Sequence, residues 1–158
     1  MKILFICTHN RCRSILAEAM TNHVGKGVIE AKSAGSQPAG KVHPLSLKYL
    51  AEKGLDTSTL QSQSWDEFEK DNFDVVITVC DSAAQEQCPL WIGNSLKVHW
   101  GLSDPSKIEG SEEKIIEAFN HTISVFEKRA KKMLSIDFSS ISEQDLKTRL
   151  TEIAEEVR

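Results

Sequence analysis

The chain opens with Lys2-Ile3-Leu4-Phe5-Ile6-Cys7-Thr8-His9-Asn10-Arg11-Cys12-Arg13-Ser14, in which an apolar run leads into a thiol and a polar loop. The apolar run 2–6 predicts a buried strand, and the residues from 13 onward predict an amphipathic helix. A loop between a strand and a helix N-terminus gathers amide N–H groups and positive potential, which together bind anions. The opening residues therefore predict an α/β fold with an oxyanion site at its first strand-to-helix turn.

Three side chains of this turn carry the predicted chemistry. Arg13 presents a planar, permanently charged guanidinium to two oxygens of a tetrahedral anion. The same positive field is expected to lower the pKa of Cys7, which makes its thiolate a nucleophile near neutral pH. Ser14 is placed to donate a hydrogen bond to that thiolate. The alternative is a buried thiol that merely ends a strand beside a solvated Arg13, and the combined pattern disfavours it.

The remaining residues of the turn complete a predicted anion loop, residues 8–14. Its members are Thr8, His9, Asn10, Arg11, Cys12, Arg13 and Ser14. Cys12 is more typical of a structural thiol that faces away from the anion, although it could oxidise with Cys7. His9 either lines the pocket or, as loop histidines more often do, faces solvent.

Composition limits the classes of function. The chain has 158 residues, 40% of them hydrophobic, and a formal net charge of −4, which suits one domain with no general affinity for nucleic acid or anionic membranes. The opening apolar run is far shorter than a secretory or membrane-spanning segment, so we expect a cytoplasmic protein. Four cysteines in a reducing compartment are expected to remain thiols, which favours chemistry over a disulfide framework.

Short apolar runs alternate with amphipathic stretches along the chain, which is typical of βαβ units and a parallel sheet. We expect a single domain with a four-stranded, mainly parallel sheet flanked by helices. The predicted strands are 2–6, 28–33, 73–79 and, more weakly, 96–100. The predicted helices are 13–24, 44–53 and 111–134, the last capped by Ser111 and buried through Ile116, Phe119, Ile123, Phe126, Ala130 and Met133.

The last residues form a separate unit in this prediction. Residues 1–134 make the catalytic domain, and residues 135–158 make a linker and a capped amphipathic helix. The apolar series Leu146, Leu150, Ile153 and Val157 favours a helix that packs on the domain, and a dimerisation or partner-binding helix is the alternative.

The sequence also resembles a known superfamily. Ile6-Cys7-Thr8, Arg13-Ser14 and Ala17-Glu18 closely resemble the low-molecular-weight tyrosine phosphatase fold, which includes the thioredoxin-coupled arsenate reductases. Further matches in order and spacing are Ser33-Ala34-Gly35, His99-Trp100-Gly101 and Asp104-Pro105. The resemblance covers residues 1–134, and it implies the fold and a general acid at Asp104.

Two features favour the reductases within that superfamily. The segment 78–89, with Cys80 and Cys88, resembles their redox segment, and Ser106-Lys107 stands where the phosphatases usually carry tyrosines. Reduction of As(V) to As(III) needs two electrons, which two thiols supply on forming a disulfide. The resemblance implies a Cys7 thiol-arsenate adduct, attack by Cys80 on Cys7, and attack by Cys88 on Cys80. Thioredoxin or another thiol reductant would then reduce the Cys80–Cys88 disulfide.

Other interpretations stay open. A protein-tyrosine phosphatase would use Cys7, Arg13 and Asp104 without the other cysteines, and a non-catalytic oxyanion-binding or partner-binding module would use the C-terminal helix. We expect no cofactor, and the cysteine spacings match no common zinc site. Some reductases hold potassium through residues matching Asn10, Glu18 and Ser33 and an aspartate that aligns with Gln63. Because Gln63 lacks the carboxylate of that aspartate, the site is weakened and we assign no metal.

The segment between Cys80 and Cys88 is expected to change shape during the reaction. Residues 82–87 are mostly good helix formers, so the reduced segment is predicted to begin a helix after the central strand. A helix that continued to Cys88 would hold the two cysteines too far apart for a disulfide.

Overall fold

A parallel four-stranded sheet forms the centre of the computed structural model, which describes residues 1–86 and 89–158. The strands are β1 (Lys2–Ile6), β2 (Glu30–Ala34), β3 (Val75–Thr78) and β4 (Leu96–His99), in the order β2-β1-β3-β4. Ile6 pairs with Ala34 and Thr78, and Thr78 pairs with His99. The carboxyl ends of the strands therefore meet at one edge, where α/β sheets usually place their sites.

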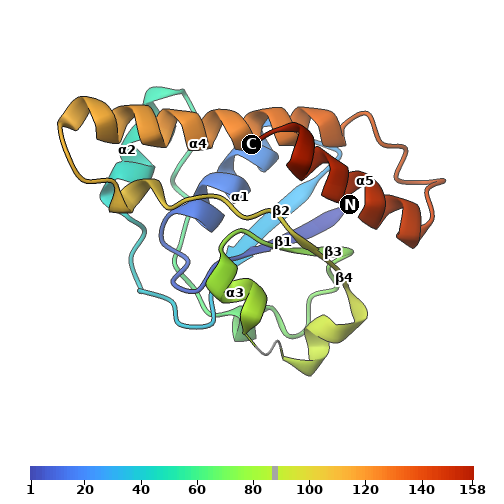
Figure 1. Ribbon diagram of the computed structural model, residues 1–158. Helices are drawn as coiled ribbons and strands as arrows, with labels where there is room; N and C mark the ends of the chain where they lie inside the picture. Colours follow the sequence, from blue (N-terminus) through green and yellow to red (C-terminus); the bar gives the residue numbers. More distant parts are fainter. Residues whose placement is uncertain (87–88) are drawn as a thin grey trace.

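Helices cover both the sheet and one another. Helix α1 (Arg13–Val24) lies against β1, β2 and α4 (Glu112–Met133), and α2 (Pro44–Glu52) packs beside α1 and α4. Figure 1 shows α4 running across α1, with the short α3 (Asp81–Gln85) on the other side of the sheet. The 3-10 turns are η1 (Trp65–Phe68), η2 (Leu90–Asn94) and η3 (Pro105–Lys107).

The predicted fold class is confirmed, and the differences lie at the ends of elements. The strand predicted at 28–33 begins at Glu30, because Gly27, with a φ of 85°, and the half-exposed Val28 form the turn that follows α1. The central strand is shorter than the apolar run 73–79. Ser111 caps α4 as expected, accepting a hydrogen bond from the Lys114 amide at 3.3 Å.

The C-terminal helix α5 (Glu143–Glu156) packs on the domain, against β4 and α4. Leu146, Leu150 and Ile153 are buried, and the Trp100 indole donates a hydrogen bond to the Leu150 carbonyl at 2.9 Å. The buried Arg129 guanidinium donates to three carbonyls, those of Trp100, Ala154 and Val157. The prediction of a packing helix is thus confirmed. Among the described residues, no helix is long and apolar enough to span a membrane.

Candidate active site

A cavity of about 120 Å³ opens beside the carboxyl ends of β1 and β3. Its walls come from the anion loop, the start of α3 and the η3 turn. The lining residues are Cys7, Thr8, His9, Arg11, Cys12, Arg13, Cys80, Ser82, Asp104 and Lys107. The cavity thus brings together four of the five predicted catalytic residues, and the fifth, Cys88, lies outside the described residues. A larger groove of about 690 Å³ lies on the other side of Arg13, towards α5, but no cysteine lines it.

Asn10 stabilises the conformation of the anion loop. Its backbone φ is 46°, in the left-handed region that asparagine tolerates better than most residues. Its buried amide donates to the hydroxyls of Ser14 at 2.8 Å and Ser33 at 3.0 Å and accepts from the Gln63 amide at 2.8 Å. Its side chain thus stabilises the loop, and the predicted contact of Asn10 with substrate stays a prediction.

Gly35 gives the loop room to turn. A Cβ atom at this position would lie 2.5 Å from the carbonyl oxygen of Thr8 and 2.8 Å from that of Cys7. Side chains essentially never approach backbone oxygens this closely, so only glycine lets the end of β2 pass directly under the loop.

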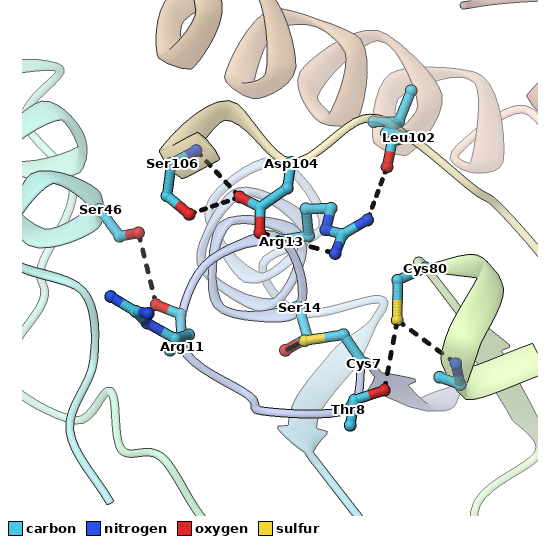
Figure 2. A network of polar contacts seen from close by, with 11 residues as sticks. Cys7, Thr8, Arg11, Arg13, Ser14, Ser46, Cys80, Leu102, Asp104 and Ser106 are labelled. Atoms are coloured by element: carbon cyan, nitrogen blue, oxygen red, sulfur yellow. Dashed lines mark hydrogen bonds and ion pairs between the residues drawn. The ribbon is translucent and has the colours of Figure 1, made fainter. Parts of the chain in front are cut away.

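Cys7 is almost completely buried, with its sulfur 2.9 Å from the Ser14 hydroxyl (Figure 2). Burial raises the pKa of Cys7 above its ordinary value, while hydrogen bonds from the Ser14 hydroxyl and from the amides of Ser14 and Asn10 oppose that rise. The sequence-based prediction of a lowered pKa is therefore wrong. The sequence shows the donors of the loop but not the loss of water around the sulfur, which depends on the fold.

Arg13 and Asp104 form an ion pair at the rim of the cavity. One guanidinium nitrogen lies 3.6 Å from the carboxylate, and another donates to the Leu102 carbonyl at 2.9 Å (Figure 2). Burial works to raise the pKa of Asp104. Hydrogen bonds from the Ser106 hydroxyl and amide, followed by the charges of Arg13 and Lys107, outweigh burial and hold that pKa below its usual value. Without substrate, Asp104 is therefore a carboxylate at neutral pH.

Cys80 caps the N-terminus of α3 and lines the same cavity as Cys7. Its buried sulfur accepts a hydrogen bond from the Ala83 amide at 3.4 Å and lies 3.9 Å from the Thr8 hydroxyl. Figure 2 shows its side chain pointing towards the loop that carries Thr8 and Cys7. The predicted helix after the central strand is present but ends at Gln85, because Glu86 already has an extended backbone, with ψ 147°.

Cys12 behaves as a structural thiol. It is 2% exposed, and burial raises its pKa to about 12, with a hydrogen bond from Ser46 acting in the opposite direction. A thiol in this state stays protonated near neutral pH and reacts slowly. His9 is exposed on the rim, with its Nδ1 atom 3.1 Å from the Gln37 carbonyl oxygen.

The residues that match the potassium ligands of some reductases form a closed hydrogen-bond network. Ser33 donates to Glu18 at 2.7 Å, and the Gln63 side-chain amide donates to the Ser33 carbonyl at 3.2 Å. Burial raises the pKa of Glu18 and so favours its neutral form. With these oxygens engaged and no carboxylate at Gln63, the set does not fit potassium. Within residues 1–86 and 89–158, no three His, Cys, Asp or Glu side chains are grouped to hold a metal.

Several residues near the cavity are not among the predicted site residues. Lys107 and Ser82 line the cavity, and Glu86 accepts a hydrogen bond from Thr8 at 2.7 Å. Lys107 belongs to the Ser106-Lys107 pair after Asp104-Pro105, so its place in the sequence could have pointed to the cavity. Nothing in the local sequence points to Glu86, since the contact depends on how the chain turns after α3.

Comparison with known proteins agrees with this geometry. Residues 2–149 match the family described as low molecular weight phosphotyrosine protein phosphatase. An arsenate reductase of Halalkalibacterium halodurans is 36% identical over 129 residues, which span 82% of this chain and 91% of that protein.

Solved structures give the same relationship. The arsenate reductase of Archaeoglobus fulgidus superposes with a TM-score of 0.69 and 28% identity, covering 85% of this chain and 99% of that one. A thioredoxin-dependent arsenate reductase of Corynebacterium glutamicum has a TM-score of 0.60 and 32% identity, covering 85% of this chain and 63% of that one. The chain therefore belongs to the low molecular weight phosphotyrosine protein phosphatase family, and within that family it groups with the arsenate reductases.

Proposed function

We propose that this chain reduces arsenate to arsenite, with Cys7 as the nucleophile and Cys80 and Cys88 as the thiols of a disulfide relay. One observation carries the proposal: Cys7 and Cys80, from neighbouring strands, line one small cavity together with Arg13 and Asp104. A hydrolase needs a single thiolate, whereas a two-electron reduction needs a second thiol within reach of the first.

The cavity suits an inorganic oxyanion. Its volume of about 120 Å³ lies below the range of about 300–1,000 Å³ that is typical of sites for organic ligands. Arsenate would take the place that Asp104 holds beside the guanidinium of Arg13, and the amides of the anion loop would bind the other oxygens. Substrate binding therefore weakens the Arg13–Asp104 ion pair.

That exchange also prepares Asp104 to act as an acid. The loss of Arg13 as a partner and the approach of an anion both raise the pKa of a carboxyl group. Asp104 can then take up a proton and give it to the oxygen that leaves arsenic as Cys7 attacks. Arg13 and Asp104 thus pair with each other before arsenate binds. During formation of the thiol-arsenate adduct, Arg13 binds the anion and Asp104 donates a proton to the leaving oxygen.

The second half of the reaction is the transfer of electrons. Cys80 attacks the Cys7 sulfur, arsenite leaves, and a Cys7–Cys80 disulfide remains. Cys88 then displaces Cys7, and an external dithiol reduces the Cys80–Cys88 disulfide. The thioredoxin dependence of the Corynebacterium protein supports thioredoxin as that dithiol. In this proposal residues 1–134 do the chemistry, and residues 135–158 provide a linker and a packing helix.

A coupled assay tests the proposal. Reduced protein, thioredoxin, thioredoxin reductase and NADPH should consume NADPH only when arsenate is added, with one arsenite formed per NADPH. Cys80→Ser and Cys88→Ser should each abolish multiple turnover, while leaving any weak hydrolysis of an aryl phosphate at Cys7 in place. Full arsenate turnover by both variants would refute the relay and favour a phosphatase.

A further inference from the structure

Thr8 joins Cys80 to a carboxylate that the reaction scheme above does not use. The Thr8 hydroxyl donates to Glu86 Oε1 at 2.7 Å. The Oγ1 atom of Thr8 also lies 3.9 Å from the Cys80 sulfur. Thr8 belongs to the anion loop, whereas Cys80 and Glu86 stand at the two ends of α3. The two contacts of Thr8 therefore connect both ends of α3 to the anion loop. Figure 2 shows the contact between Thr8 and Cys80.

The direction of these hydrogen bonds follows from the number of protons. A hydroxyl has one proton to donate, and Thr8 gives it to the carboxylate. The Thr8 oxygen can then only accept from the Cys80 thiol. The Cys80 sulfur in turn accepts from the Ala83 amide, which stabilises negative charge on that sulfur. The arrangement is a continuous path from a thiol proton to a carboxylate.

We propose that Glu86, acting through the Thr8 hydroxyl, accepts the thiol proton of Cys80 at the step in which Cys80 attacks Cys7. The inference rests on the proposed arsenate reduction. It adds Glu86, as a positioning residue that acts through Thr8, to the predicted set Cys7, Arg13 and Asp104. Thr8 is the relay, and Glu86 is the final acceptor.

Protons and electrons balance in this step. The Cys80 proton passes to the Thr8 oxygen as the Thr8 proton passes to Glu86, which leaves a Cys80 thiolate and a neutral Glu86. The thiolate attacks the Cys7 sulfur, the S–S bond forms and the Cys7–As bond breaks. The electron pair of that bond stays on arsenic, which goes from As(V) to As(III) while the two thiols are oxidised.

Other charged groups around Cys80 are engaged elsewhere. Asp81 is 88% exposed and lies 3.0 Å from His99 Nε2, while Asp104 is held by Ser106 and Arg13. The remaining charged or titratable groups of the cavity are the thiols Cys7 and Cys12, the imidazole of His9 and the cations Arg11, Arg13 and Lys107. As cations, the three basic side chains carry no free lone pair that could accept the thiol proton.

The experiment measures arsenite formation in a single turnover, with reduced protein in excess over arsenate and across a range of pH. Glu86→Gln should slow the reaction about 10²-fold near neutral pH, and the loss should disappear in alkaline buffer, where hydroxide removes the proton. Thr8→Val should show the same profile, and Thr8→Ser should restore the wild-type one. The double variant Thr8→Val, Glu86→Gln should be no slower than either single variant.

Glu69→Gln is the matched control, because this carboxylate is exposed in the turn after η1 and outside the cavity, and its profile should match the wild type. A wild-type profile for Glu86→Gln, or an equal loss at every pH, would overturn the inference while leaving arsenate reduction intact. Absence of arsenite from the wild-type protein would instead refute the proposed function. If Glu86→Gln unfolds, the comparison of Thr8→Val with Thr8→Ser decides the question.

Discussion

Ser14 has the strongest single influence in favour of a charged Cys7. Burial and the hydrogen bond from Ser14 act on the pKa of Cys7 in opposite directions, and burial prevails in the absence of substrate. Burial therefore favours the neutral thiol, and the donors of the anion loop favour the thiolate. The protonation state of the Cys7 sulfur therefore depends on both burial and the Ser14 hydrogen bond.

Removal of the Ser14 hydroxyl tests that balance. Ser14→Ala should raise the pKa of Cys7 further, by about one to two units, because one hydrogen bond to a charged group contributes about 1.5–3 kcal/mol. The measurement is the pH dependence of iodoacetamide labelling at Cys7, resolved from the other thiols by peptide mass analysis. Ser135→Ala, at the end of α4, is the control and should leave the labelling midpoint unchanged. A midpoint shared by wild type and Ser14→Ala would contradict the assignment.

At the scale of elements, the anion loop depends on the close passage of β2 beneath it. Gly35→Ala should push the Thr8 and Cys7 carbonyls outward, because the new methyl group would overlap their oxygens. We expect a loss of about 1–3 kcal/mol in the free energy of unfolding, together with weaker arsenate binding. Denaturant unfolding and calorimetric titration measure the two effects.

Gly93→Ala is the matched control, since a Cβ atom there would meet nothing within 4 Å. It should leave both the unfolding free energy and the arsenate affinity close to wild type. Normal stability with normal affinity in Gly35→Ala would mean that the loop can shift without cost, which this account excludes.

Helix α5 contributes stability through its buried face. Leu150 is 1% exposed beneath the helix, so Leu150→Ala should lower the free energy of unfolding by about 2–5 kcal/mol. Lys147→Ala, on the exposed side of the same helix, should change stability by less than about 0.5 kcal/mol. Equal effects of the two substitutions in chemical denaturation would show that α5 does not pack on the domain.

The same scale shows how far local sequence determines structure. Strands 2–6 and 96–100 and the capped helices were predictable because burial pattern and capping residues act over a few neighbouring positions. The early end of α3 was not predictable, since residues 82–87 favour a helix and the Thr8–Glu86 hydrogen bond that accompanies the turn is a tertiary contact. The raised pKa of Cys7 was missed for a related reason, because burial depends on the whole fold.

At the scale of the whole molecule, the sheet brings the two reactive thiols together. Cys7 follows β1 and Cys80 follows β3. These two strands are neighbours because the strand order of the sheet is β2-β1-β3-β4. Asp104 arrives from the segment after β4. The motif around Cys7 specifies anion binding, but only the parallel arrangement of the strands puts a second thiol in the same cavity.

The most direct test of this account is the identity of the first disulfide. Cys88→Ser removes the proposed second resolving thiol and should trap the protein after one turnover. Treatment with arsenate should yield one arsenite per protein and a disulfide-linked pair of peptides containing Cys7 and Cys80, identified by mass spectrometry without reduction. Phosphate in place of arsenate should leave all thiols free. Arsenite formation without a Cys7–Cys80 disulfide, or a disulfide between Cys7 and Cys12 instead, would contradict the account.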